Sequence, residues 1–376
     1  MIEPLPLVDG ALFVSSSFLS TLSCPRESYY YKIRAKVLAS KGAGLQFGTH
    51  LHSALALHYR LQEFKLSPSE IKSRVTTMLE GEFEKHPTPE GNFRTLNWAV
   101  TIYEQYCRKF SEDSFDLLKW KERRPCKQCH GQGKAEVITH PDNPVKAEIE
   151  CIWCNGTGSQ SLMVEVPFVV KLFDYDLIGE QIGWAKEGNK LPVYYHGIID
   201  LPILRGSLVH VLDFKSALAL GDGYWDDKKM LPQLKGYCMA LSEVLDRPIH
   251  GYYVRAIRTK EPPQWLVEGK PSKKGEIRKI EDWWDESLGE QRFDLGQGEI
   301  SIWKENAIAL VEQFLWQYSR GFFPENKNQC VRKYGKCQYF SVCETFPIED
   351  REMLITSADY ETKKENNQLA NKSHDE

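Results

Sequence analysis

Two acidic residues stand inside the most apolar runs of this chain, and they constrain its fold more than any other feature. Asp200 ends the run VYYHGIID, and Asp213 lies in SLVHVLDFKSA, with LPILRG between the two stretches. A carboxylate is costly to bury unless a cation or a metal ion faces it. Each acid therefore needs a charged partner at a fixed place in the interior.

The two runs predict neighbouring strands joined by a hairpin at RGS. Side chains two residues apart in a strand share a face, so Asp213 and Lys215 point the same way while Phe214 turns into the core. The hairpin would bring Asp200, Asp213 and Lys215 to a common point. The alternatives are an ordinary Asp213–Lys215 ion pair on a partly exposed face, or Asp200 as the cap of a turn.

Paired carboxylates on adjacent strands suit Mg²⁺ or Mn²⁺, because these hard ions prefer oxygen ligands and keep water molecules for a substrate phosphate. Lys215 would add a positive charge where negative charge develops on a phosphate under attack. The three side chains together predict phosphate chemistry assisted by a divalent ion.

Apolar spacing predicts an α/β fold, with helices in the first 120 residues and strands from Leu162 onward. Further helices are expected over LPQLKGYCMALSEVL and WKENAIALVEQFLWQYSRG. The expected segments are 1–125 (mostly helical), 126–158 (a metal-binding insertion), 159–260 (the core with the acids), 261–300 (a polar loop), 301–350 (a helix and cysteines) and 351–376 (a disordered tail).

The composition is that of an ordinary globular protein, with 376 residues, 41% hydrophobic residues and a net charge of −4. No apolar run is long enough to span a membrane, and the N-terminal residues lack the features of a signal peptide. We therefore expect a cytoplasmic protein with no membrane partner. Basic runs at 119–127, 254–260 and 270–279 could contact nucleic acid, although such runs are also typical of a solvated face.

The ten cysteines fall into two metal-like groups and two isolated residues. Cys107 and Cys238 lie within helical patterns and are expected to be buried small side chains. Two Cys-x-x-Cys pairs, 21 residues apart, predict a four-thiolate Zn²⁺ site. Its ligands would be Cys126, Cys129, Cys151 and Cys154.

Both zinc-site pairs resemble the Cys-x-x-Cys-x-Gly-x-Gly repeat of DnaJ-type zinc domains. The insertion is expected to guide DNA; a surface for a protein partner and a structural brace are the alternatives. A chaperone-like protein built on this module is a more distant alternative, because it leaves the acids unexplained.

Five motifs, in order, resemble the PD-(D/E)XK nuclease superfamily, within it the RecB-like branch of CRISPR-associated and AddB-type iron–sulfur exonucleases. They are SSSFLSTLSCPRESYYYK, FGTHLHSAL, GIID, DFKSA and QLKGY. The resemblance implies a restriction-endonuclease-like core, a central mixed sheet flanked by helices. Leu201 and Pro202 depart from the family, where many members carry an arginine, and Glu165 resembles an upstream acid of some members.

The resemblance also implies roles for the matching residues. His52, Asp200, Asp213 and the Phe214 carbonyl would hold Mg²⁺ or Mn²⁺, and Lys215 would assist the attacking water. Gln233 and Tyr237, four residues apart on one helical face, would orient the site.

A second metal group is implied at the ends of the chain. The stretch CVRKYGKCQYFSVC supplies Cys330, Cys337 and Cys343, and the resemblance proposes Cys24 as the fourth ligand of a [4Fe–4S] cluster. Zinc is the alternative at these four thiolates.

We expect a metal-dependent DNA nuclease, an exonuclease on single-stranded DNA or DNA ends, in recombination, repair or replication. A helicase or a recombination or replication protein is the expected partner, and a viral protein acting in the host cytoplasm fits equally well. The alternative is a noncatalytic DNA-binding or assembly subunit that keeps the nuclease fold.

Overall fold

The protein is described by a computed structural model. The description covers residues 4–38, 42–113, 115–118, 123–125, 132, 134–138, 146–150, 159–161, 164–176, 190–332, 335–345 and 349–362. Cys126, Cys129, Cys151 and Cys154, and with them the predicted zinc site, lie outside these residues.

A five-stranded mixed sheet forms the centre of the molecule, in the order β13-β12-β11-β10-β3. Only β11 and β12 run parallel to each other, and their neighbours are antiparallel. The strands are β3 (Asp116–Leu117), β10 (Leu201–Arg205), β11 (Leu208–Ala217), β12 (Gly251–Arg258) and β13 (Leu288–Asp294). The predicted hairpin is confirmed, because β10 and β11 pair with Leu201 opposite Leu212.

A second sheet of three strands has the order β1-β9-β8. Its members are β1 (Leu12–Ser15), β8 (Val166–Asp176) and β9 (Lys190–Ile199). Asp200 is the one residue between β9 and β10, so the chain passes from one sheet to the other at this acid.

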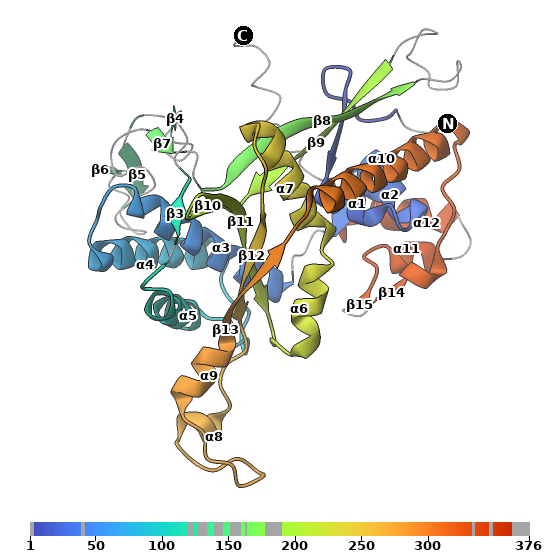
Figure 1. Cartoon of the computed structure of the whole chain (residues 1–376). Helices are drawn as coiled ribbons and strands as arrows, with labels where there is room; N and C mark the ends of the chain where they lie inside the picture. The colour runs from blue at the N-terminus through green and yellow to red at the C-terminus, as the bar shows by residue number, and fades with distance from the viewer. Residues whose placement is uncertain are drawn as a thin grey trace.

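Helices cover both faces of the central sheet, and β11 shows why. Val209 and Val211 pack into one apolar cluster, whereas Leu212 and Phe214 pack into another. A strand buried on both faces is apolar throughout, as this run is. The first cluster is covered by α7 (Pro232–Leu245) and α10 (Gln297–Arg320), and the second by α3 (Ala43–Gln62), α4 (Pro68–Lys85) and α5 (Leu96–Lys109) (Figure 1).

The two ends of the described chain meet in a small lobe. β2 (Lys36–Leu38) pairs with β16 (Tyr360–Thr362), and Tyr30 packs with Tyr339, Val342, Ile355 and Tyr360. The lobe also contains α2 (Pro25–Ser28), a π-helix (Tyr29–Ile33), β14 (Val331–Arg332), β15 (Gly335–Lys336), α11 (Phe340–Glu344) and α12 (Glu349–Ile355). The preceding helix, α1 (Ser16–Thr21), packs on α10 through Phe18 and Phe314.

The α/β prediction is confirmed, but two segments are more regular than the sequence indicated. Residues 261–300, expected as a polar loop, contain α8 (Gln264–Val267), α9 (Ile280–Ser287) and the edge strand β13. β13 was missed because an edge strand with one wetted face carries few apolar residues. The expected tail begins too early, since α12 and β16 extend the packed structure to Thr362.

Other short elements complete the fold: α6 (Asp222–Lys229) before α7, and the two-stranded pairs β4 (Arg123–Pro125) with β7 (Ser159–Ser161) and β5 (Lys134–Ile138) with β6 (Lys146–Glu150). Among the described residues, no helix is both long and apolar enough to cross a membrane.

Candidate active site

Asp200 lies where the two sheets meet, with its carboxylate turned toward β11. The Phe214 backbone N–H donates to Asp200 Oδ2 at 3.0 Å. This hydrogen bond ties the first acid to the residue beside the second, so the two strand ends are held in fixed relation. Asp200 retains 21% of its side-chain exposure, enough for a ligand to reach it.

Asp213 faces the α7 side of β11 and is almost wholly buried, with 2% of its side chain exposed. Lys215 Nζ lies 2.8 Å from Asp213 Oδ2. This oxygen has the lysine as an ion-pair partner but accepts no well-aligned hydrogen bond among the described residues. The carboxylate thus has a lone pair left for a further positive group.

The electrostatics of the two acids are coupled. Burial and, after it, the negative charge of Asp213 raise the pKa of Asp200 to about 6, against the opposing effects of His52, Lys215 and the Phe214 N–H. Burial alone would lower the pKa of Lys215, but Asp213 and Asp200 outweigh it and hold that pKa above its ordinary value. The lysine stays charged, and the acid pair still lacks positive charge.

His52 comes to the acids from α3, with Nδ1 at 3.6 Å from Asp200 Oδ2. The helix can approach this closely because residue 48 is glycine: a Cβ there would lie 2.6 Å from Ser216 Oγ, at the end of β11. Gly48, the glycine of FGTHLHSAL, therefore allows α3 to pack closely against β11, the strand that carries Asp213.

Gln233 and Tyr237 extend the site along α7, which begins with Pro232. Lys215 Nζ donates to Gln233 Oε1 at 3.2 Å, and Gln233 Nε2 donates to the Tyr237 hydroxyl at 2.8 Å. Burial raises the pKa of Tyr237, with Asp213 and Asp200 adding to it, so the phenol remains protonated.

All six predicted side chains are thus joined in one connected group, from His52 through Asp200, Asp213, Lys215 and Gln233 to Tyr237. The predicted common point of the two acids and the lysine is confirmed as geometry. The Asp213–Lys215 ion pair named as an alternative also exists, but it is buried rather than on a partly exposed face.

A hollow of about 770 Å³ opens beside Gln233, between α1, α7 and α10. Its walls include Ser16, Lys235 and Trp303. The hollow gives a ligand room directly beside the connected group.

Sequence reasoning missed the support behind Phe214. Arg255, 1% exposed, donates to the hydroxyls of Tyr59 and Tyr106 at 2.5 and 2.7 Å and pairs with Asp113. Tyr59 stacks on Phe214, with ring centroids 5.9 Å apart. This network fixes the residue between Asp213 and Lys215.

The same observation corrects the reading of the basic run 254–260, because Arg255 is internal and does not contribute to a nucleic-acid surface. The apolar neighbours of Arg255 in GYYVRAI were the signal that it is buried and paired.

Glu165 lies next to the site through its backbone. Its N–H donates to the Asp200 carbonyl at 2.8 Å, while its half-exposed carboxylate pairs with Arg60 Nη2 at 3.0 Å. Leu201 and Pro202 are buried strand residues. Where many family members have an arginine after the first acid, this chain has side chains that pack in the core.

The four cysteines assigned to a cluster lie in the terminal lobe. Asn326 Nδ2 donates to the Ser23 carbonyl at 2.9 Å, and the Cys337 N–H donates to the Cys330 carbonyl at 2.9 Å. Burial, the charge of Glu325 and the nearby thiols of Cys24 and Cys337 together raise the pKa of Cys343 to about 12, against the opposing charge of Arg26. Segments 306 residues apart thus meet, and none of these four cysteines is in a disulfide.

Neither the acids nor these cysteines form a finished ligand set. Among the residues that the structure describes, no three His, Cys, Asp or Glu side chains are arranged to hold a metal ion. At the acids, however, the donor chemistry fits a hard divalent ion: two carboxylates short of positive charge, an imidazole 3.6 Å from one of them and a carboxylate oxygen with an unused lone pair.

A family model described as the PD-(D/E)XK nuclease superfamily matches residues 14–344, which include the connected group and the predicted cluster cysteines. No curated protein matches the chain.

Proposed function

The chain belongs to the PD-(D/E)XK nuclease superfamily, whose members are typically metal-dependent nucleases, and from this premise we propose that it hydrolyses phosphodiester bonds in DNA with Mg²⁺ or Mn²⁺. The observation that carries the proposal is the gathering of six side chains, from His52 on α3 to Tyr237 on α7, around the end of β11, where the Phe214 N–H holds Asp200 beside Asp213. A family fold without this group would support only DNA binding.

The metal ligands in this proposal are His52, Asp200, Asp213 and the Phe214 carbonyl. A divalent ion there would supply the positive charge that the acids lack and a water molecule activated for attack on phosphorus. The raised pKa of Asp200 supports this assignment, because a cation bound between two carboxylates relieves their repulsion.

Lys215 remains protonated beside the acids and is positioned to neutralise charge on the phosphate as the bond breaks. Gln233 accepts a hydrogen bond from Lys215 and donates one to Tyr237, so it fixes the ammonium group. Because Tyr237 accepts from Gln233, its own proton is left to donate to a substrate oxygen.

We propose exonuclease action on single-stranded DNA or DNA ends, as in the RecB-like branch. The hollow beside Gln233 supports this substrate, since it offers room for unpaired nucleotides at the residue that binds Lys215. The test is cleavage of end-labelled single- and double-stranded DNA with Mn²⁺, Mg²⁺ or chelator. Stepwise shortening from an end is expected, and uniform internal cuts would contradict the exonuclease assignment.

A [4Fe–4S] cluster on Cys24, Cys330, Cys337 and Cys343 is part of the proposal. The convergence of these segments and the proximity of three of the thiols support it. An anaerobic preparation should be brown, absorb near 400 nm in the way of iron–sulfur proteins and contain iron and sulfide. Zinc in place of iron would contradict the cluster.

The insertion 126–158 is proposed to bind Zn²⁺ through Cys126, Cys129, Cys151 and Cys154 and to guide DNA. Its support is the spacing of the cysteines alone. Deleting 126–158 should weaken DNA binding more than turnover of bound DNA. An unchanged DNA affinity would favour the protein-docking or bracing role.

The biological setting is proposed to be recombination, repair or replication in the cytoplasm of a cell or of a virus-infected host, with a helicase or another recombination or replication protein as partner. The noncatalytic subunit is the competing function, and the same cleavage assay separates the two. DNA binding without any metal-dependent cleavage would support the subunit.

A further inference from the structure

An arm of residues 259–287 leaves the central sheet between β12 and β13 and carries α8 and α9. Figure 1 shows it projecting from the body of the molecule. The arm starts beside the proposed catalytic strand: the Thr259 N–H donates to the Ala217 carbonyl at 2.7 Å, two residues beyond Lys215. DNA that passes the acids toward this edge of the sheet therefore meets the arm.

The base of the arm is rigid. Trp98 Nε1 donates to the Thr259 carbonyl at 2.7 Å, and the Trp98 ring lies 6.3 and 5.4 Å from the rings of Trp283 and Trp284. Arg258 covers Trp283 at 5.2 Å. Because both ends of the arm are anchored to buried tryptophans, its direction is fixed by the core.

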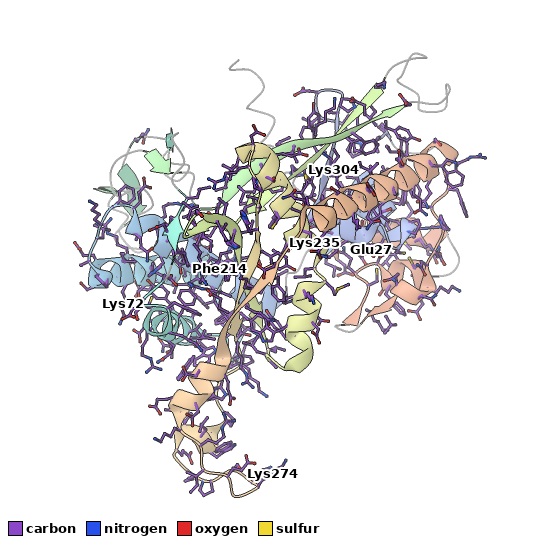
Figure 2. All side chains as sticks on the ribbon, viewed as in Figure 1. Glu27, Lys72, Phe214, Lys235, Lys274 and Lys304 are labelled. Carbon is purple, nitrogen blue, oxygen red and sulfur yellow. The ribbon has the colours of Figure 1, made fainter. Side chains whose placement is uncertain are left out.

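The tip of the arm is an ordered turn. The Ser272 N–H donates to the Glu276 carbonyl at 2.8 Å, and Gly275, with φ of +80°, donates to the Ser272 carbonyl at 2.9 Å. Ser272 Oγ accepts from the N–H groups of Lys274 and Glu276 at 3.2 and 3.1 Å. The turn displays Lys274 at the far end of the arm (Figure 2).

The charge at this tip is one-sided, although the whole chain is acidic. Residues 270–279 contain five lysines or arginines and one acid, Glu276. Arg278 pairs with Glu286 and Lys270 with Glu268. In the part of the chain that is described, no carboxylate lies at ion-pairing distance from the ammonium groups of the remaining three, which are Lys273, Lys274 and Lys279.

An exposed apolar side chain accompanies these lysines, since Ile277 is 79% exposed. Unpaired cations on a rigid, projecting turn suit the regular phosphates of a nucleic acid, and an apolar side chain among them can contact sugars or base edges. The arm that carries these cations starts beside the proposed catalytic strand, and this favours the DNA in the site over an acidic protein surface as the ligand.

We propose that the tip of this arm binds the sugar-phosphate backbone of the DNA flanking the scissile phosphate, through Lys273, Lys274 and Lys279. The inference rests on the proposed function, because it takes DNA as the substrate. The arm would then increase the affinity for DNA that is long enough to extend past the active site.

The test measures binding of a 40-nucleotide DNA, single-stranded and duplex, in chelator at several salt concentrations. The variant is Lys273→Ala/Lys274→Ala/Lys279→Ala. Each phosphate contact with duplex DNA contributes about 0.9 to the slope of log affinity against log salt, so the variant should lower the slope by about 2 to 3. Affinity at low salt should fall by about tenfold or more.

Two controls make the result specific. Lys273→Arg/Lys274→Arg/Lys279→Arg keeps the charge and should bind like the parent protein. Lys171→Ala/Lys190→Ala/Lys304→Ala removes the same charge from β8, β9 and α10 and should leave the slope within one unit of the parent value. Equal slopes for the parent and the arm variant, or equal losses in the two alanine variants, would overturn the proposal.

Substrate length separates this proposal from the proposed function. A DNA of about six nucleotides should be cleaved equally by the parent and the arm variant, whereas kcat/KM on the 40-nucleotide DNA should fall in the variant. If the parent cleaves both and the variant matches it on both, the arm assignment fails while the nuclease stands. If the parent binds DNA through the arm but cleaves nothing, the nuclease assignment fails and the arm stands.

Discussion

At the scale of single residues, the ionised carboxylate of Asp200 is the group that the folded protein destabilises. Its pKa shift from 3.8 to about 6 corresponds to about 3 kcal/mol at 1.4 kcal/mol per unit. The ionised pair is therefore unfavourable until a cation joins it. Function and stability oppose each other at this position, as is common at active sites.

Asp200→Asn should stabilise the metal-free protein by roughly 1–3 kcal/mol at pH 7.5, because it removes the repulsion and keeps an acceptor for the Phe214 N–H. It should also abolish the stabilisation that Mn²⁺ gives the parent. Urea unfolding with chelator and with Mn²⁺ checks both. Asp176→Asn, at an exposed acid, should change stability by less than 0.5 kcal/mol; a destabilised Asp200→Asn protein would contradict the assignment.

The pH dependence has a defined sign. Because the pKa of Asp200 is raised in the folded state, its contribution to the stability of the metal-free protein is full below pH 3.8 and is lost as the pH rises through about 6. Metal binding runs the other way: the apparent Mn²⁺ affinity should rise about tenfold per unit up to about pH 6 and then level off. Calorimetric titration measures it, and a flat profile between pH 5 and 6 would count against Asp200 as a ligand.

At the scale of elements, α7 holds Gln233 and Tyr237 only because it lies unusually close to its neighbours. A Cβ at Gly236 would lie 2.4 Å from the Trp303 ring of α10 and 2.6 Å from the Tyr195 hydroxyl of β9. Neither the aromatic ring nor the strand can move without disturbing the core. Gly236 therefore allows α7 to pack closely against α10 and β9, and this places Gln233 within reach of Lys215.

Gly236→Ala should destabilise the protein by about 1–3 kcal/mol through overpacking, and it should lower cleavage because α7 must shift. The matched control is Gly81→Ala on α4, where nothing lies within 4 Å of the added Cβ. That change should stabilise by up to about 1 kcal/mol through helix propensity. Thermal unfolding compares them, and equal effects at the two glycines would refute the close-packing account.

The elements also show what sequence could and could not predict. β11 is a continuous apolar run and α7 has a helical pattern, so both elements were predicted from the sequence, and the side chains that share a face followed from strand and helix geometry. β13, α8 and α9 did not, because a polar edge strand and two short helices on an arm bury few side chains. Arg255 was misassigned for a related reason: its partners Tyr59, Tyr106 and Asp113 lie at least 142 residues away in sequence.

At the scale of the whole molecule, the N-terminal and C-terminal parts of the described chain pack against each other. Arg26 Nε donates to the Phe323 carbonyl at 2.9 Å, and Arg34 pairs with Glu352, so the N-terminal helices and the C-terminal lobe support each other. The fold alone makes these contacts, which explains how Cys24 can approach the distant cysteines. Sequence spacing could not have paired them; only the family resemblance proposed it.

Ile355, fully buried in the terminal lobe, tests this closure. Ile355→Ala should cost about 2–4 kcal/mol and speed the reaction of Cys24 with a thiol reagent, because the lobe would open more often. Met353→Ala, at a side chain 69% exposed, is the neighbouring control and should change neither. Unchanged stability and thiol reactivity in Ile355→Ala would show that the lobe does not hold the ends together.

The central claim, that the connected acids and lysine cut DNA, is tested most directly by cleavage of end-labelled DNA with Mn²⁺ by the parent, Asp213→Ala and Lys215→Ala. Both variants should fold, bind DNA and lose activity by about 10³-fold or more. Variants that cut DNA at the rate of the parent protein would contradict the account.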